Sequence, residues 1–306
     1  MAARPRVVIA PPPGAQGPGP MPSAAVDALD LALVRRTAGV LPGEHRGLGV
    51  GLGTELAQLR PYQIGDDVRQ LDPSASARTG VPHVRQQVPD RALTTWVVLD
   101  LSPSMAFGTA RRLKSDVAEG VVRVVSRLGV RRGGRVCLVT CGSGSVRALP
   151  PRGGRRAIGA VRRALEEGVA TDGPAQTGDG LAAALSRLRG MARQPGLVVV
   201  VSDFRDASDW GRPLRALGAR HRVLAAEVVD PRERELVDAG LIVLVDPEGG
   251  RQVEVDTGSK TLRETFARAE AERRGALHET LRRAGARHVA LDTSADWLLA
   301  LGRGLG

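Results

Sequence analysis

From Thr94 onward, short apolar runs alternate with longer stretches of helical periodicity, and this alternation constrains the fold more than any other feature of the chain. The apolar runs are mostly continuous, as expected for strands that helices cover on both faces. Such alternation is typical of an α/β protein with a doubly wound, mostly parallel sheet. The predicted strands are 94–100, 135–141, 197–202, 221–228 and 287–291. The predicted helices are 110–129, 154–167, 179–193, 209–218 and 260–285.

Two further segments predict antiparallel hairpins. Gly142-Ser-Gly-Ser separates two apolar runs, which indicates an edge hairpin over residues 135–149. A second hairpin is predicted over residues 241–256, with its turn at Pro247-Glu-Gly-Gly250.

The chain upstream of the alternating region divides into two parts by composition. Residues 1–24 are rich in Pro, Gly and Ala, which predicts a disordered tail. Residues 25–92 form a predicted N-terminal extension that begins with a short amphipathic helix over residues 25–38, and residues 93–306 form the α/β domain. No window approaches 18 consecutive apolar residues, and the N-terminus lacks the continuous apolar segment of a secretory signal. We therefore expect a cytoplasmic protein without a membrane span.

The net charge of +11 is unevenly distributed, because residues 101–170 carry fourteen Arg and Lys residues against four Asp and Glu. This asymmetry suggests an acidic partner surface or nucleic acid, while the alternative is a solvated basic face without a partner. Phe107 is the only aromatic residue of the stretch, so the stacking platforms of single-strand binders are missing and nucleic acid is unlikely. The predicted basic partner face comprises Arg111, Arg112, Lys114, Arg131, Arg132, Arg155 and Arg156.

Oxygen-bearing side chains follow two of the predicted strands. Asp100 ends the first strand, and hydroxyls follow two and four residues later. The carboxyl ends of parallel strands are where such sheets bind ligands, and a set of oxygen donors suits a hard cation such as Mg²⁺. The predicted metal ligands are Asp100, Ser102, Ser104, Thr177, Asp179 and Asp203. The alternative is that Ser102 and Asp203 only cap the helices that follow them.

The D-x-S-x-S opening, a later Thr and a later Asp resemble the metal-ion-dependent adhesion site of von Willebrand factor A-type domains. An upstream block, Arg60-Pro-Tyr-Gln-Ile-Gly-Asp-Asp-Val-Arg69 followed by Leu71-Asp72 and Ser76-Ala-Arg78, is similar to the signature of the bacterial domain of unknown function 58 family. The resemblance covers about residues 40–300. It implies an A-type domain with an N-terminal extension, and association with MoxR-type AAA+ ATPases.

In an adhesion site, as the resemblance implies, the serines and the threonine coordinate the cation directly while the aspartates act largely through water. A Glu or Asp of the partner then completes the coordination. This chain departs from the pattern, because Asp179 falls on the usual Thr position and Thr177 lies two residues earlier. Either the loop presents Thr177, or the site holds its metal tightly and recruits partner carboxylates poorly. A second departure is Pro73, where the family usually has Trp.

The Gly-Asp-Asp-Val-Arg block has two interpretations. Its charged residues form an ion-pair network that pins the extension to the A-type core, or they contact a partner. Acid/base chemistry is disfavoured, because neighbouring arginines tend to keep both carboxylates ionised. The residues concerned are Asp66, Asp67, Arg69, Asp72 and Arg78.

These features predict a non-catalytic, Mg²⁺-dependent protein-interaction module. By the resemblance, it serves as an intracellular adaptor for a MoxR-type AAA+ ATPase in the assembly or maturation of another protein, through an acidic surface of its partner. Two alternatives are nucleic-acid binding through the Arg-rich half and metal-dependent hydrolysis. The sequence offers no nucleophile with a base beside it, and its five histidines form no His-Glu-x-x-His motif.

Overall fold

The computed structural model of the protein describes residues 17–29, 55–64, 66–88, 93–168, 180–247 and 249–305. The chain divides into two compact units, a larger one from residues 1–39 and 93–306 and a smaller one from residues 40–92.

A six-stranded sheet forms the centre of the larger unit, with the strand order β10-β7-β6-β3-β4-β5. Five strands are parallel and the edge strand β5 is antiparallel to β4. The predicted α/β fold with a mostly parallel sheet is confirmed, including the antiparallel hairpin at its edge. The strands are β3 (Thr94–Asp100), β4 (Arg135–Cys141), β5 (Arg147–Gly153), β6 (Leu197–Ser202), β7 (Arg222–Val229) and β10 (Ala286–Asp292).

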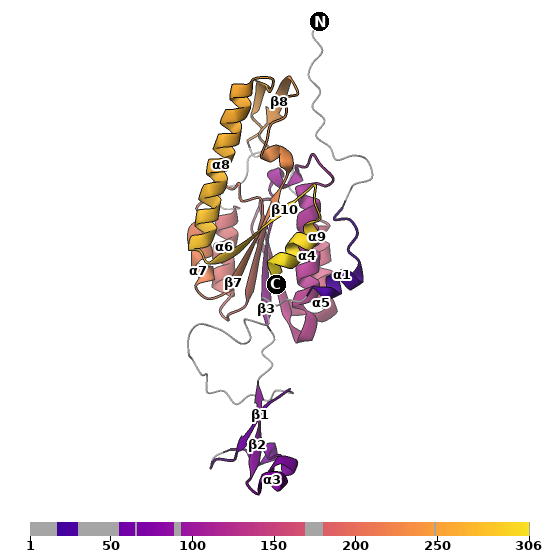
Figure 1. The fold of residues 1–306 in the computed structure, drawn as a ribbon, viewed down its shortest axis with the longest axis vertical. Coiled ribbons are helices and arrows are strands. Elements are labelled where there is room, and N and C mark those ends of the chain that lie inside the picture. The colour runs from indigo at the N-terminus through magenta and orange to yellow at the C-terminus, as the bar shows by residue number, and fades with distance from the viewer. Residues whose placement is uncertain are drawn as a thin grey trace. The chain divides into compact units, whose positions relative to one another are not determined.

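Helices cover both faces of this sheet, which is why its central strands are continuously apolar. Helices α6, α7 and α8 lie on one face, while α4, α5 and α9 lie on the other (Figure 1). Alternate residues of β3 serve two separate cores, with Val97 and Leu99 facing α4 and Trp96 and Val98 facing α6. The helices are α4 (Lys114–Gly129), α5 (Gly154–Leu165), α6 (Leu181–Met191), α7 (Gly211–Gly218), α8 (Lys260–Arg283) and α9 (Trp297–Leu305).

Residues 17–28 belong to the larger unit, whereas the sequence predicted a disordered tail to residue 24 and then the extension. Trp297 Nε1 donates a hydrogen bond to the Pro18 carbonyl at 3.0 Å, and Gly17 N donates to Asp116 Oδ1 at 3.0 Å. Helix α1 (Ser23–Ala28) buries Val26 in the core beside α4. The segment is held because the indole N–H of α9 needs an acceptor and because Val26 is apolar. The rest of the predicted 25–38 helix lies outside the described residues.

The smaller unit pairs β1 (Glu55–Pro61) with β2 (His83–Val88), with η1 (Val68–Gln70) and α3 (Pro73–Thr79) between them. Several carboxylates in and near its Gly-Asp-Asp-Val-Arg block accept hydrogen bonds from nearby backbone N–H groups. Asp67 accepts from Arg69 N at 3.0 Å, and Asp72 accepts from Ala75 N at 2.8 Å. Short carboxylates at the start of a helical turn reach these free N–H groups readily.

Among the described residues, this block contains an ion pair that the sequence did not predict. Asp66 does form an ion pair, but with Arg60 at 2.6 Å, a residue not predicted for the network. The Arg78 guanidinium donates to the Ser74 carbonyl. The role in pinning this unit to the larger one stays a prediction.

Beyond β7 the chain forms a second hairpin, β8 (Leu241–Val245) with β9 (Gln252–Asp256), as predicted for residues 241–256. Leu241, Val245 and Val253 of this hairpin are exposed. Of the helices in the described ranges, none combines the length and apolar character needed to cross a bilayer.

Candidate metal centre

Four of the six predicted metal ligands come together at the carboxyl ends of β3 and β6. Ser102 N donates to Asp100 Oδ1 at 2.9 Å, and the hydroxyls of Ser102 and Ser104 lie 3.1 Å apart. Ser104 in turn hydrogen-bonds to Asp203. Ser102 precedes the short helix η2 (Pro103–Ala106) but makes no side-chain capping bond to it, so the capping alternative does not describe its hydroxyl. The other two predicted ligands, Thr177 and Asp179, lie outside the described residues.

Ser202, which the sequence analysis did not single out, also belongs to this cluster. Its hydroxyl donates to Asp100 Oδ2 at 2.6 Å and accepts from Phe204 N at 2.9 Å. The second bond accompanies a tight reversal, because Phe204 adopts a left-handed backbone with φ of 54°. Its place one residue before Asp203, at the end of an apolar run, was the available signal.

Lys114 is buried in this centre, so its predicted place on an exposed basic face is wrong. Its ammonium lies 2.6 Å from Asp203 Oδ2 and 2.6 Å from Glu233 Oε1, and its side chain is 0% exposed. The reason is that α4 begins at Lys114 rather than near residue 110. Side chains of a helix lean toward its N-terminus, which here faces the strand ends that carry the carboxylates.

The pKa values of the two aspartates of the centre shift in opposite directions. Burial, together with the neighbouring Asp203 charge, raises the pKa of Asp100 to about 6. Burial would raise the pKa of Asp203 as well, but the Lys114 ammonium holds it below its ordinary value. Lys114 itself keeps a raised pKa despite its burial, because Asp203 and Glu233 favour its charged form.

This donor set fits a hard divalent cation. Asp100 accepts from hydroxyl and backbone donors, whereas Lys114 contacts Asp203. The described donors are carboxylate and hydroxyl oxygens, the ligands of Mg²⁺ and Ca²⁺. A second positive charge would relieve the repulsion between Asp100 and Asp203 that raises the pKa of Asp100.

Glu233, another residue that the sequence analysis missed, pairs with Lys114 of this centre. It lies in η4 (Pro231–Glu233), directly after β7, and also pairs with Arg205 at 3.2 Å. The Arg205 guanidinium also forms an ion pair with Glu270 of α8 at 3.2 Å. Of the four predicted ligands that converge, only Ser102 is half-buried and the other three are buried. The chain thus supplies a further carboxylate of its own beside the Lys114 ammonium.

The other residues of the predicted basic face are divided between the carboxyl and the amino ends of the parallel strands. Arg111 is exposed in the loop between η2 and α4, and Arg112 donates to the Gly17 carbonyl at 2.8 Å. Arg155 and Arg156 follow Gly153, which pairs with the first residue of β4, at the amino end of the parallel strands. Arg131 also lies there, between α4 and β4, and the Arg132 side chain lies outside the described part.

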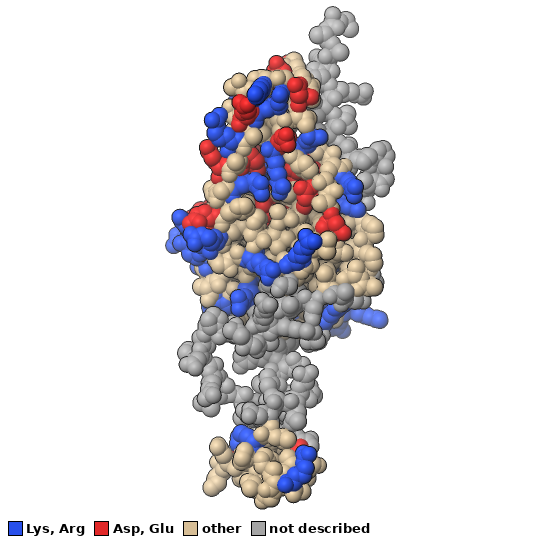
Figure 2. Space-filling view, viewed as in Figure 1, with Lys and Arg blue, Asp and Glu red and all other residues tan. Residues whose placement is uncertain are grey.

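The view of Figure 2 shows no single basic field. Acidic and basic side chains are interspersed on the face around α8 and the β8–β9 hairpin.

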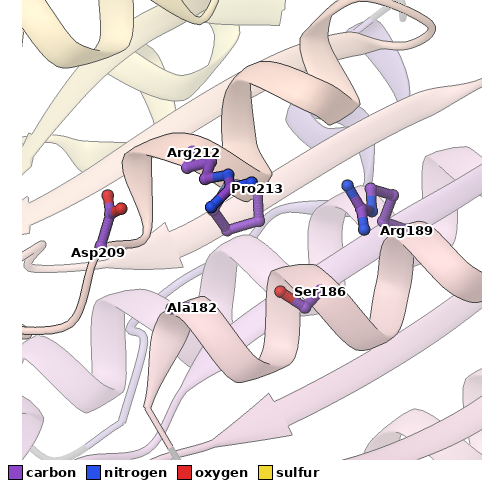
Figure 3. A pocket seen from close by; sticks show the side chains of 6 residues that line it. All are labelled: Ala182, Ser186, Arg189, Asp209, Arg212 and Pro213. Atoms are coloured by element: carbon purple, nitrogen blue, oxygen red, sulfur yellow. The ribbon is translucent and has the colours of Figure 1, made fainter.

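An open groove of about 310 Å³ lies elsewhere on the larger unit, between α6 and α7. Figure 3 shows Ser186 and Arg189 on one side and Arg212 and Pro213 on the other. None of the four predicted metal ligands that the structure describes lines it.

Comparison with known proteins places a family on most of the chain. The model of the family described as protein of unknown function DUF58 matches residues 58–276. Uncharacterized protein Rv1480 of Mycobacterium tuberculosis is 41% identical over 281 residues, which cover 91% of this chain and 87% of that protein. Uncharacterized protein Mb1516 of Mycobacterium bovis matches to the same extent.

Two solved structures are similar to parts of the chain. Conserved hypothetical protein BatB from Bacteroides thetaiotaomicron has 14% identity and a TM-score of 0.40, covering 70% of this chain and 97% of that chain. A von Willebrand factor type A structure from Catenulispora acidiphila has 14% identity and a TM-score of 0.34, covering 58% of this chain and 42% of that chain.

Proposed function

This chain belongs to the DUF58 family of unknown function, and we propose that it is a non-catalytic protein-interaction module controlled by a divalent cation. The observation that carries the proposal is the meeting of two buried carboxylates and two hydroxyls at adjacent strand ends. Among these described groups the hydroxyls contact carboxylates rather than a histidine or a free amine, and Lys114 is held as a paired ammonium. The arrangement therefore favours binding over turnover.

The cation that we propose is Mg²⁺, held by Asp100, Ser102, Ser104 and Asp203. Thr177 or Asp179 would add a further oxygen. When bound, the metal supplies a positive charge that attracts a carboxylate of the partner. Lys114 keeps Asp203 ionised and in place, and Glu233 keeps Lys114 in place.

The partner class that we propose is a MoxR-type AAA+ ATPase inside the cell, which the family resemblance suggests. The partner surface would be acidic, because the metal centre attracts carboxylates and Arg111, in the loop before α4, is exposed. The complex would serve the assembly or maturation of another protein.

The direct test is calorimetric titration of Mg²⁺ into the chelator-treated protein. We expect saturable binding that the double variant Ser102→Ala/Ser104→Ala weakens at least about tenfold, because two oxygen ligands are lost. The control is Ser294→Ala, since Ser294 donates to Asp292 in a similar turn at the end of β10 without touching this centre. Equal affinity in all three proteins, or no binding, would contradict the metal site.

The same variants test the interaction. An immobilised wild-type protein should retain the purified MoxR-type ATPase of its own organism in Mg²⁺ and release it in chelator. The Ser294→Ala protein should behave identically, and the double variant should retain none. Retention that ignores both chelator and the two serines would refute a metal-controlled interface. Binding that weakens steeply with salt would agree with an acidic partner surface.

A further inference from the structure

Three potential metal ligands lie together on the face of the sheet that α8 covers. They are Glu227 of β7, His288 of β10 and His278 of α8. One ligand atom from each of the three lies within 4.8 Å of the others. None of them was predicted as a ligand, because 51 residues separate the carboxylate from the first histidine and the motif has no fixed spacing.

The carboxylate of this cluster is the least satisfied part. Glu227 is 0% exposed, and its Oε2 lies 2.9 Å from His288 Nε2. Its other oxygen, Oε1, has no hydrogen-bond partner within the described chain, and the Arg273 guanidinium is 3.7 Å away. A buried carboxylate oxygen without a donor is costly, so this oxygen is available to a ligand.

The two histidines are placed so that both rings approach the carboxylate. Their ring centroids are 4.9 Å apart and their planes are inclined by 56°. His278 is exposed on α8 and His288 is half-buried, so the cluster opens to solvent on the His278 side. Partial burial, His288 and Arg274 lower the pKa of His278.

Two arginines set the electrostatics around the cluster. Arg273 is shared with Glu270, to which it donates twice at 2.9 and 2.8 Å, so its charge is largely balanced. The positive charge of Arg274 lowers the pKa of both Glu227 and His278. This added positive charge reduces the affinity of the cluster for a cation relative to a site without it.

We propose that Glu227, His278 and His288 bind a borderline divalent transition metal such as Zn²⁺, with solvent at the remaining coordination position. Two imidazoles and one carboxylate are a common zinc set, and nitrogen ligands distinguish this site from the all-oxygen centre at Asp100. Binding cross-links β7, β10 and α8, and the metal replaces the missing donor of Glu227 Oε1.

The experiment is a titration of chelator-treated protein with Co²⁺, whose visible absorption reports tetrahedral nitrogen and oxygen ligation, followed by displacement with Zn²⁺. We expect one Co²⁺ per chain with an intense tetrahedral spectrum. His278→Ala removes an exposed ligand and should lower the Co²⁺ affinity at least about tenfold. The control is His83→Ala, which removes a histidine of the smaller unit.

Three outcomes decide between a metal site and a structural pair. No tetrahedral spectrum for the wild type, or equal affinity in His278→Ala and His83→Ala, overturns the proposal. In that case Glu227 and His288 form only a buried hydrogen-bonded pair. Loss of the spectrum in His278→Ala with unchanged circular dichroism supports it. The double variant Ser102→Ala/Ser104→Ala should keep the Co²⁺ spectrum, which separates this site from the proposed Mg²⁺ centre.

Discussion

At the scale of single residues, the decisive feature is a lysine that enters the metal centre from a helix start. Lys114 is fully buried and lies 2.6 Å from carboxylates of two different loops. Removing one partner of a buried ion pair leaves an uncompensated charge, which costs far more than losing a surface pair. When no metal ion is bound, the buried Asp203 carboxylate therefore depends on Lys114 to compensate its charge.

We expect Lys114→Met to lower the free energy of unfolding by about 3 to 5 kcal/mol in chelator, measured by urea denaturation. Added Mg²⁺ should restore more stability to this variant than to the wild type, because the metal then replaces the cationic partner that Asp203 has lost. Lys260→Met is the matched control, since Lys260 pairs with Glu264 on the exposed surface of α8 and should change stability by less than about 1 kcal/mol. An equal loss in both variants would contradict the buried pairing.

At the scale of elements, the loop after β4 presses against the loop that carries the metal ligands. Gly142 has a positive φ of 85°, and a Cβ there would lie 2.5 Å from Ser102 N and 2.7 Å from Ser102 Cα. Gly144 of the same loop also has a positive φ, 114°, but a Cβ there would meet nothing within 4 Å. The pair separates backbone strain from contact with the metal-ligand loop.

Gly142→Ala should destabilise the protein by about 1 kcal/mol or more beyond Gly144→Ala, because both strain the backbone but only the first displaces Ser102. It should also weaken Mg²⁺ binding, measured by the same calorimetric titration, whereas Gly144→Ala should leave the affinity unchanged. If the two variants lost equal stability and equal affinity, packing of Gly142 against the ligand loop would not matter.

At the scale of the whole larger unit, Asp230 joins three separate segments at the carboxyl edge of the sheet. It is 0% exposed and accepts hydrogen bonds from Thr109, Arg232 N and Thr293. Burial alone would raise the pKa of Asp230, but the hydrogen bonds from Thr109 and Thr293 hold it below its ordinary value. The ends of β7 and β10 and the loop before α4 are thereby fixed to one carboxylate.

A lowered carboxyl pKa in the folded state stabilises the protein above the unfolded value, which is 3.8 for Asp, and this stabilisation is lost as the pH falls through the folded value. Asp230→Asn should therefore cost roughly 2 to 3 kcal/mol at neutral pH and show a shallower loss of stability below about pH 4. Urea denaturation across pH checks both. Asp256→Asn, an exposed turn carboxylate that accepts from Gly258 N, is the control and should match the wild type. A steep acid slope that survives in Asp230→Asn would contradict this assignment.

Ion pairs also connect the two candidate sites across the larger unit. The series runs from Asp203 through Lys114 and Glu233 to Arg205, Glu270, Arg273 and Glu227. Its members come from the ends of β6 and β7, from α4 and from α8. Sequence spacing indicated only the Glu270–Arg273 pair, which lies within α8, because the partners of the other pairs are at least 28 residues apart.

The sequence alone determined the strands of the larger unit, its two hairpins and the side chains of the D-x-S-x-S loop, because these depend on apolar periodicity and on residues that are neighbours in the chain. It did not predict the β1–β2 pair of the smaller unit. It located all five parallel strands to within a residue at most ends, and it placed Asp100 and Asp203 at adjacent strand ends. It missed α9, and it could not show that Lys114 points inward, that Glu233 and Ser202 join the metal centre, or that Glu227 meets two histidines. Those facts depend on where α4 begins and on which strands and helices pack together. They are decided by tertiary contacts, in which a charged side chain is buried only where opposite charges from distant segments surround it.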